Sequence, residues 1–342
     1  MIRKGLVASL LGSIAAIGLW VACLPSEPEI IASTPSQDEA GAPDAGMCDP
    51  NAPFTNRGRV FAAPLGQDRR GATLTNDEKT IYFGFTASGF LGRQYPAKLY
   101  VPDRNGPDEK FDGGRPMEGA LNGLAGQDYP RFNHDGRIIV FAGHLDGGAP
   151  DGSPEGPNNP YLYFATKGDA GTFGTPQRLK LPLNTGSVTF NPFLRTLPGG
   201  GGDLWFSQCT EPGGCFGDGG TLAIYRADVL HDRFEATNAF SIPVRVEGGV
   251  DLPNTNEYSP VVSADGNELL YSSAAAIYST YQTTPGQWTK PRSIPLGGVY
   301  RDAPAWISPD HCRLYYESQV ENENGSPSIV DIYLATRPAP GH

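Results

Sequence analysis

Four acidic residues recur at matching places along the chain, each shortly before a predicted apolar strand. They are Asp68, Asp128, Glu257 and Asp302, and Asn184 stands near the equivalent place in a fifth segment. Oxygen ligands gathered at one point suit a Ca²⁺ ion, and they also suit the hydroxyls of a sugar. Paired carboxylates on either side of a glycosidic bond act as acid and as base or nucleophile. These residues therefore form a candidate ligand site if the fold brings them together.

The alternative is that each acid accepts backbone N–H bonds and braces a loop, which is a common use of Asp and Glu near strand ends. The sequence contains no Ser-centred nucleophile elbow, no phosphate-binding loop and no His-Glu-x-x-His motif. The histidines at 134, 144, 231 and 311 are scattered, and no metal-binding trio can be argued from their spacing. Two of them, His134 and His311, lie in predicted hairpin turns, where exposure to solvent is expected. The sequence therefore assigns no catalytic residue and leans against an enzyme.

A repeated hairpin organises the chain around these acids. Each copy is an apolar strand, a turn of the Asp-Gly kind that tolerates positive φ, and a second apolar or aromatic strand. In the third copy Leu197, Pro198 and four glycines replace the turn. Repeats with a period of about 40 to 60 residues are typical of propellers and solenoids. The copies cover residues 72–83, 129–141, 190–206, 258–271 and 303–316.

Further strands follow each hairpin. Third strands are predicted at 98–100, 161–164, 223–226, 276–278 and 331–334. Fourth strands are predicted at 173–181, 234–244 and 288–294. Four antiparallel strands in each repeat are typical of a propeller blade. The content of 44 glycines and 32 prolines agrees with many tight turns.

The two ends of the repeat region complement each other. Residues 59–65 look like a fourth strand but precede the first copy, whereas the last copy stops after its third strand. An N-terminal strand that completes the last blade would close the ring and cover its edges. The sequence thus predicts an all-β, five-bladed β-propeller closed by an N-terminal strand, with six blades as the alternative if segment 84–127 or 207–255 hides a degenerate copy.

The repeats resemble the WD40-like PD40 repeats of TolB-type propellers. The resemblance depends on Ser-Pro-Asp at 308–310, Ser-Ala-Asp-Gly at 263–266 and Asp-Ile-Tyr at 331–333, and covers about residues 55–338. The third copy departs from the pattern, and the separate N-terminal domain of TolB is missing. The resemblance implies a binding platform in the periplasm or facing the cell envelope, and it carries no catalytic residue with it.

The first 22 residues have the order of a secretory signal peptide: Arg3 and Lys4, an apolar run, and small residues before Cys23. An uncleaved membrane anchor is the alternative. The segment 19–23 resembles the lipobox of bacterial lipoproteins, although Trp20 stands where that family has Leu. The resemblance implies lipidation of Cys23, with Leu24 favouring transfer to the outer membrane, and a secreted soluble protein as the alternative.

Residues 23–52 are predicted to form a disordered tether before the propeller at 53–342. Positions 24–52 hold six acidic residues and no Lys or Arg, so they cannot bury a core. The net charge of the whole chain is −11. Nucleic acid is therefore excluded as a partner, since binding it needs a concentrated basic surface.

Four cysteines remain after Cys23, an even number that favours disulfides in an exported protein. Cys209 and Cys215 are close enough in sequence to close a small loop. By elimination, Cys48 and Cys312 form the second pair, which would join the end of the tether to the last repeat. Zinc is the competing interpretation, but no His pair stands at ligand spacing beside these cysteines.

Together these features predict a monomeric, envelope-anchored propeller that acts as a non-catalytic scaffold for an envelope protein or a cell-wall glycan. Its contact with the membrane would be through the lipid anchor alone. The alternative is a carbohydrate-active, glycosidase-like or metal-binding propeller that uses an acidic central funnel. No cofactor is predicted, with calcium left open.

Overall fold

The computed structural model describes most of the chain beyond the predicted tether. The described residues are 48–62, 68–86, 98–123, 125–144, 160–180, 182–184, 189–198, 200–209, 221–231, 233–251, 255–297, 301–319 and 329–338. They belong to one compact unit, Pro43–His342. The predicted signal peptide, Cys23 and nearly all of the tether lie outside them. No helix within these described ranges is long and apolar enough to cross a membrane.

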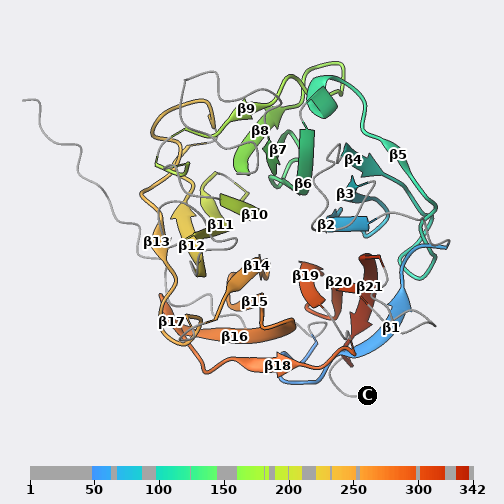
Figure 1. Cartoon of the computed structure of the whole chain (residues 1–342), viewed down its shortest axis with the longest axis vertical. Helices are drawn as coiled ribbons and strands as arrows, with labels where there is room; N and C mark the ends of the chain where they lie inside the picture. Colours follow the sequence, from blue (N-terminus) through green and yellow to red (C-terminus); the bar gives the residue numbers. More distant parts are fainter. Residues whose placement is uncertain are drawn as a thin grey trace, which may run out of the picture. The chain divides into compact units, whose positions relative to one another are not determined.

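Antiparallel strands make up five sheets, which we number as blades 1 to 5 in chain order (Figure 1). Blade 1 consists of β2 (Asp68–Leu74), β3 (Ile81–Thr86), β4 (Lys98–Val101) and β5 (Arg115–Pro116). Blade 2 consists of β6 (Ala125–Phe132), β7 (Ile138–His144), β8 (Tyr161–Thr166) and β9 (Gln177–Arg178). Blade 3 consists of β10 (Thr189–Thr196), β11 (Gly202–Cys209), β12 (Leu222–Asp228) and β13 (Val244–Arg245).

The last two blades differ at their outer edges. Blade 4 consists of β14 (Glu257–Val262), β15 (Glu268–Ser273), β16 (Ala276–Thr284), β17 (Gln287–Trp288) and β18 (Arg292–Ile294). Both β17 and β18 pair with the long β16. Blade 5 consists of β19 (Arg301–Ile307), β20 (Arg313–Gln319), β21 (Asp331–Thr336) and β1 (Thr55–Arg59).

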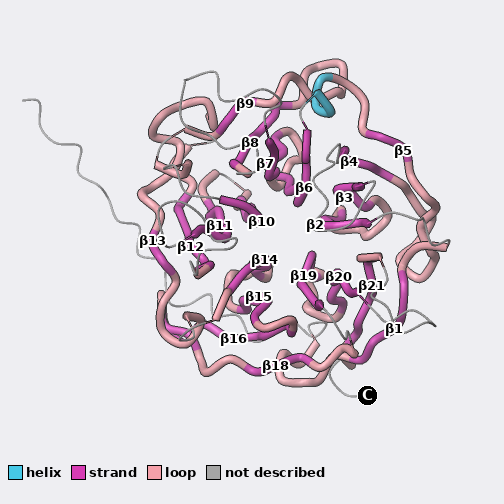
Figure 2. Tube along the Cα trace, viewed as in Figure 1, coloured by secondary structure: helices cyan, strands magenta, loops and turns pink. Residues whose placement is uncertain are grey.

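The first strand of every blade lies nearest the centre of the ring (Figure 2). These inner strands are β2, β6, β10, β14 and β19. The predicted five-bladed propeller is confirmed, and the six-bladed alternative is wrong, because the segments that were suspected of a hidden copy contribute to blades 1 and 3. A single 3-10 helix, η2 (Ala120–Gly123), interrupts the described β structure.

The predicted third strands are present, but the fourth strands are shorter than predicted. In blades 2 and 3 only β9 and β13 pair, each over two residues. The aromatic residues that suggested longer strands, Phe173 and Phe234, are buried in packing instead. Their apolar character therefore reflects contacts of the loops with the core.

The N-terminal strand closes the ring by pairing with β21, but at Thr55–Arg59 rather than at 59–65. Val60 and Phe61 come directly after it and are buried beside Phe83 and Trp306, in a cluster shared by blades 5 and 1. The Val60 N–H donates to the Ile332 carbonyl over 3.1 Å. The apolar residues that predicted the strand thus fill the seam between the blades, and residues 63–67 lie outside the described part.

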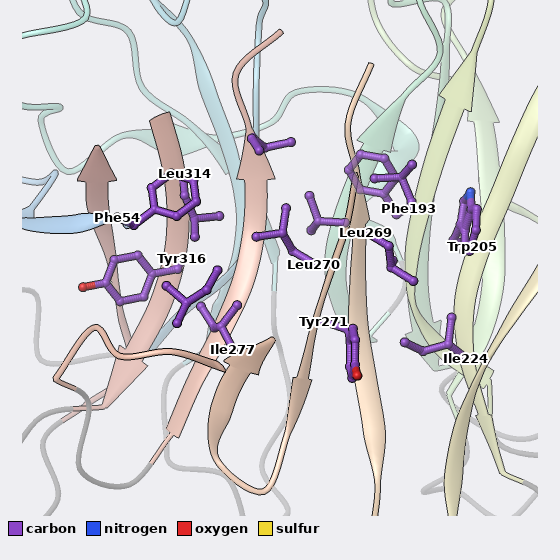
Figure 3. Packing of buried hydrophobic residues seen from close by; sticks show 14 of the residues in the cluster. Phe54, Phe193, Trp205, Ile224, Leu269, Leu270, Tyr271, Ile277, Leu314 and Tyr316 are labelled. Carbon is purple, nitrogen blue, oxygen red and sulfur yellow. The ribbon is translucent and has the colours of Figure 1, made fainter. Parts of the chain in front are cut away.

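Packing between blades is aromatic and aliphatic. Figure 3 shows the cluster at blades 3, 4 and 5, where Trp205, Leu269, Tyr271 and Tyr316 lie among buried neighbours. Burial of each such side chain contributes roughly 1.5–3 kcal/mol. These contacts hold the inner strands in a fixed arrangement around the centre.

A disulfide joins Cys48 to Cys312, in the hairpin of blade 5. The Cys48 N–H also donates to the Asp310 carbonyl over 2.9 Å. Cys209 is disulfide-bonded as well, while Cys215 lies outside the described residues. The end of the predicted tether is therefore fastened to the blade that the N-terminal strand completes.

Candidate functional site at the centre of the propeller

Four of the inner strands share an unusual backbone feature. Where the register shifts in each, one residue has a positive φ: Gly71 at 61°, Tyr129 at 54°, Asn191 at 52° and Ser259 at 53°. Such angles are uncommon for residues other than glycine. A bulge of this kind bends the strand and redirects the side chains next to it. The residues beside these bulges are therefore the ones to inspect for a site.

Asp68 behaves as a brace between blades 1 and 5. Its Oδ1 accepts the Val330 N–H over 2.9 Å, and its Oδ2 pairs with Arg70 Nη2 over 2.6 Å. The side chain is buried. This is the loop-bracing role that the sequence left open for the acidic residues.

Glu257 and Asp302 are also buried, each on its own inner strand. Glu257 accepts a hydrogen bond from the Thr255 hydroxyl. The backbone of Asp302 bonds to Ser272 Oγ over 3.0 Å and to the Ala275 carbonyl over 3.0 Å.

Asn184 belongs to blade 2 and serves as a backbone brace. Its side chain accepts the Leu162 N–H over 3.1 Å and donates to the carbonyls of Leu162 and Leu179. Asn122 holds Leu99 of blade 1 in the same way. Asn184, which the sequence matched to the four acids, therefore has a structural role that it shares with Asn122 and not with those acids.

Asp128, on β6, is the one of the four predicted acids that is not a fully buried residue. One oxygen accepts the Tyr129 N–H over 3.0 Å. Burial and, to a smaller extent, the negative charge of Glu317 raise the pKa of Asp128 to about 7, against the attraction of Arg70. This carboxyl group is therefore poised to gain or lose a proton near neutral pH.

Glu317, on β20, is the site residue that the sequence did not reveal. It is fully buried; its Oε1 accepts the Gly71 N–H over 2.6 Å, and its Oε2 lies 3.6 Å from Arg301 Nη2. A signal was present in the repeat, because every other blade has a small residue at the matching place of its second strand. Those residues are Gly84, Ala142, Ser207 and Ser272.

Two arginines and a tyrosine complete what we call the central cluster, defined as Arg70, Asp128, Tyr129, Arg301 and Glu317. Arg301 Nη2 donates to the Tyr129 hydroxyl over 3.0 Å. Burial raises the pKa of Tyr129 above its usual range, so this hydroxyl stays protonated. The cluster joins side chains from blades 1, 2 and 5.

Arg131 is buried in the core next to the central cluster. Its Nη1 donates to the carbonyls of Gly71, Ala72 and Pro130, and its Nη2 to that of Ala305, all over 2.9 Å. Chemically, the centre thus offers one carboxyl group that holds a proton near pH 7, three guanidinium groups, and the buried carboxyl groups of Glu317 and of Asp68, the partner of Arg70. A carboxyl group tuned in this manner suits general acid catalysis.

The described residues contain no group of three or more His, Cys, Asp or Glu arranged to hold a metal ion. The expectation that His311 is exposed in its hairpin is wrong. It is buried, with Nδ1 3.0 Å from Glu268 Oε2 of blade 4. Glu268, in the neighbouring blade, holds His311 in the core, and this partner cannot be predicted from the local sequence.

No protein-family model and no curated protein sequence matches this chain. Several solved structures share its fold. One is a glycoside hydrolase (GH43_1 enzyme) from Xanthomonas citri, with a TM-score of 0.56 and 14% identity, covering 82% of this chain and 90% of the other. Another is a family 117 glycoside hydrolase from Zobellia galactanivorans, with a TM-score of 0.51 and 10% identity over 83% and 90% of the two chains.

A TolB-type protein from Agrobacterium tumefaciens is also similar, with a TM-score of 0.40 and 14% identity over 80% of this chain and 84% of the other. The propeller architecture is confirmed, and the assignment of the repeats to the TolB type stays a prediction. The first functional prediction, a non-catalytic scaffold, is wrong on this comparison, because the similar structures are mostly glycoside hydrolases.

Proposed function

We propose that this propeller is carbohydrate-active and cleaves glycosidic bonds at the central cluster, with Asp128 as the general acid. The observation that carries the proposal is Asp128, a partly exposed residue of the inner strand β6, whose carboxyl group has a pKa raised by burial to about 7 and so keeps a proton available near neutrality. In glycoside hydrolysis a carboxylic acid protonates the leaving oxygen as the glycosidic bond breaks, and water adds to the anomeric carbon and releases a proton. The fold shared with two glycoside hydrolase propellers supports the same reaction class.

Glu317 is a positioning residue in this proposal. It is fully buried and acts on Asp128 through its negative charge. Because a nearby negative charge disfavours ionisation, Glu317 keeps the proton on Asp128. Arg70 and Arg301 oppose this effect and limit how far the pKa rises.

The test is release of reducing ends by the purified protein from a panel of neutral and acidic cell-wall polysaccharides. Replacement of Asp128 by Asn should lower the rate on the active substrate roughly 100-fold or more. The control is Glu118→Gln, which neutralises an acid whose side chain is 76% exposed, close to the outermost strand of blade 1. Full activity in the Asp128→Asn variant, or no action on any member of the panel, would overturn the proposal.

The variant Glu317→Gln tests whether Glu317 acts on the pKa of Asp128 or only on the structure. Loss of the Glu317 charge lowers the pKa of Asp128, so the loss of activity on the alkaline side should begin at a lower pH. A uniform fall in rate at every pH, with an unchanged profile, would show that Glu317 acts on structure only.

We also propose, from the sequence, that Cys23 is lipidated and anchors the protein in the cell envelope, where a cell-wall glycan is the substrate. Incorporation of labelled palmitate into the wild-type chain but not into Cys23→Ser is the expected result. Equal labelling of both chains, or of neither, would contradict the anchor.

A further inference from the structure

One position is equivalent on the inner strands of all five blades. It is the residue that pairs with the matching place of the second strand, where blades 1 to 5 have Gly84, Ala142, Ser207, Ser272 and Glu317. On the inner strands this position holds Arg70, Asp128, Phe190, Tyr258 and Ala303. Because the blades repeat around the ring axis, equivalent residues lie at the same level of the centre. Asp128 and Tyr258 are therefore at one level, two blades apart (Figure 2).

These pairs divide the centre into a charged part and an aromatic part. Blades 1, 2 and 5 supply Arg70, Asp128 and Glu317, which belong to the central cluster. Blades 3 and 4 supply Phe190 and Tyr258, and both residues are half-buried. Sites for small ligands combine aromatic walls with a few polar groups. A sugar ring suits such a site, because it carries hydroxyl groups at its edge and C–H groups on its faces.

Tyr258 lies beside the charged groups that surround Asp128. The Arg301 guanidinium lies 5.6 Å from the centroid of the Tyr258 ring. The charges of Arg301 and Glu317 act on the Tyr258 hydroxyl, and the same two charges act on Asp128. Because such interactions weaken with distance, Tyr258 and Asp128 belong to the surroundings of the same two charged groups.

Packing of the core does not account for the Tyr258 ring. Other tyrosines of the blades pack on each other, as Tyr271 and Tyr278 do with ring centroids 5.8 Å apart. Within the described ranges, no other aromatic ring packs against Tyr258, and it belongs to none of the hydrophobic core clusters. The Arg301 guanidinium covers one face of the ring at most, and the half-buried side chain keeps surface that a ligand can reach.

We infer that Tyr258 binds the substrate, with a sugar ring stacked on its aromatic ring next to the glycosidic bond that Asp128 protonates. This inference rests on the proposed function and adds a substrate-binding residue to it. Stacking of this kind depends on the aromatic ring and not on the hydroxyl group. Because the contact is present in the bound substrate and in the transition state alike, its loss should raise KM and leave kcat nearly unchanged.

The test is steady-state kinetics on the polysaccharide that the wild-type protein cleaves. Tyr258→Leu keeps an apolar side chain but removes the ring, so it should raise KM roughly tenfold or more, with kcat within about threefold of the wild type. Tyr258→Phe keeps the ring, so its KM should stay within about twofold of the wild type.

Tyr278→Leu is the matched control, since Tyr278 is a half-buried tyrosine of the same blade that packs on Tyr271. It should lower the thermal midpoint and leave KM unchanged. A fall in kcat for Tyr258→Leu with no change in KM would show a structural role and overturn the inference. Tyr258→Phe keeps the test decisive if Tyr258→Leu does not fold, because a large rise in its KM would assign binding to the hydroxyl group instead.

The inference and the proposed function can fail separately. If the protein cleaves a glycan through Asp128 and Tyr258→Leu has the wild-type KM, the inference fails and the proposed function stands. If no polysaccharide is cleaved, the probes are neutral tetrasaccharides of xylose, glucose and arabinose, titrated by calorimetry. Binding that is lost in Tyr258→Leu and kept in Tyr278→Leu would support Tyr258 as a glycan-binding residue although the proposed function fails. Absence of binding would overturn both.

Discussion

The buried carboxylate of Glu317 accepts the backbone N–H of Gly71 over 2.6 Å, so a side chain of the last blade is tied to the inner strand of the first. This contact crosses the seam at which the ring closes. Gly71 is also the point where β2 has a positive φ of 61°. Ring closure and the environment of Asp128 therefore depend on the same backbone position.

Replacement of Gly71 by Ala should destabilise the propeller. The added Cβ would lie 2.5 Å from the Tyr129 backbone nitrogen and 2.7 Å from its Cδ1, so β6 must move. Crowding of this kind costs about 1–3 kcal/mol beyond the cost of the φ angle. Gly136→Ala is the matched control, since Gly136 has a φ of 68° and no atom within 4 Å of its added Cβ. Equal losses of unfolding free energy in urea for the two variants would contradict the contact.

Asp128→Asn should change how stability depends on pH. The pKa of Asp128 is raised to about 7 in the folded protein, so the folded state holds a proton that the unfolded state releases above about pH 4. Stability of the wild type therefore falls between about pH 4 and pH 7 relative to the variant, by on the order of 4 kcal/mol, and levels off above. Unfolding of both proteins at pH 5 and pH 8 measures the difference, and parallel curves would rule out the raised pKa.

Arg131→Met should weaken the contact among blades 1, 2 and 5. The substitution leaves four buried carbonyls without their shared donor. Loss of hydrogen bonds to a charged group of this kind costs about 3 kcal/mol. Arg137→Met, at an exposed position in the same blade, should change the thermal midpoint little. A thermal midpoint for Arg131→Met close to that of the control would show that the carbonyls find other partners.

The repeat pattern predicted the architecture because each blade is a local unit, with its turn and its apolar strands adjacent in sequence. The central cluster was harder to predict because it depends on contacts between blades. Asp128 was found from its repeated position, whereas Glu317 lies in a second strand and reaches Asp128 only through closure of the ring. The buried state of His311 depends likewise on Glu268, a partner in another blade. Comparison of the small residues at the position of Glu317 in the other repeats would have revealed it.

The disulfide between Cys48 and Cys312 spans 264 residues of sequence. Because a long closed loop restricts the unfolded chain strongly, its loss should cost about 4 kcal/mol. The variant Cys48→Ser with Cys312→Ser should show this loss in urea, together with faster amide hydrogen exchange in β1. Chemical reduction is a poorer test, since it also breaks the bond at Cys209. Unchanged exchange in β1 would mean that pairing with β21 alone keeps the ring closed.

Glu268, like the disulfide, stabilises the closed ring. Replacing Glu268 should lower the free energy of unfolding most near neutral pH. Burial alone would raise the pKa of Glu268, but its bonds to His311, Arg337 and Tyr281 lower it below the usual value. Arg337 also donates to the Pro50 carbonyl over 2.9 Å and so holds the segment that leads into β1.

A carboxylate with a lowered pKa contributes stability above its unfolded pKa, and this contribution disappears as the pH falls through the folded value. Glu268→Gln should therefore cost about 3 kcal/mol at pH 7, because it leaves Arg337 buried without its partner, and much less at pH 3. Glu118→Gln, at an exposed site, should cost little at either pH. A loss for Glu268→Gln that is the same at both values would show that the charge of Glu268 contributes nothing, and that only the shape of its side chain matters at the seam of blades 4 and 5.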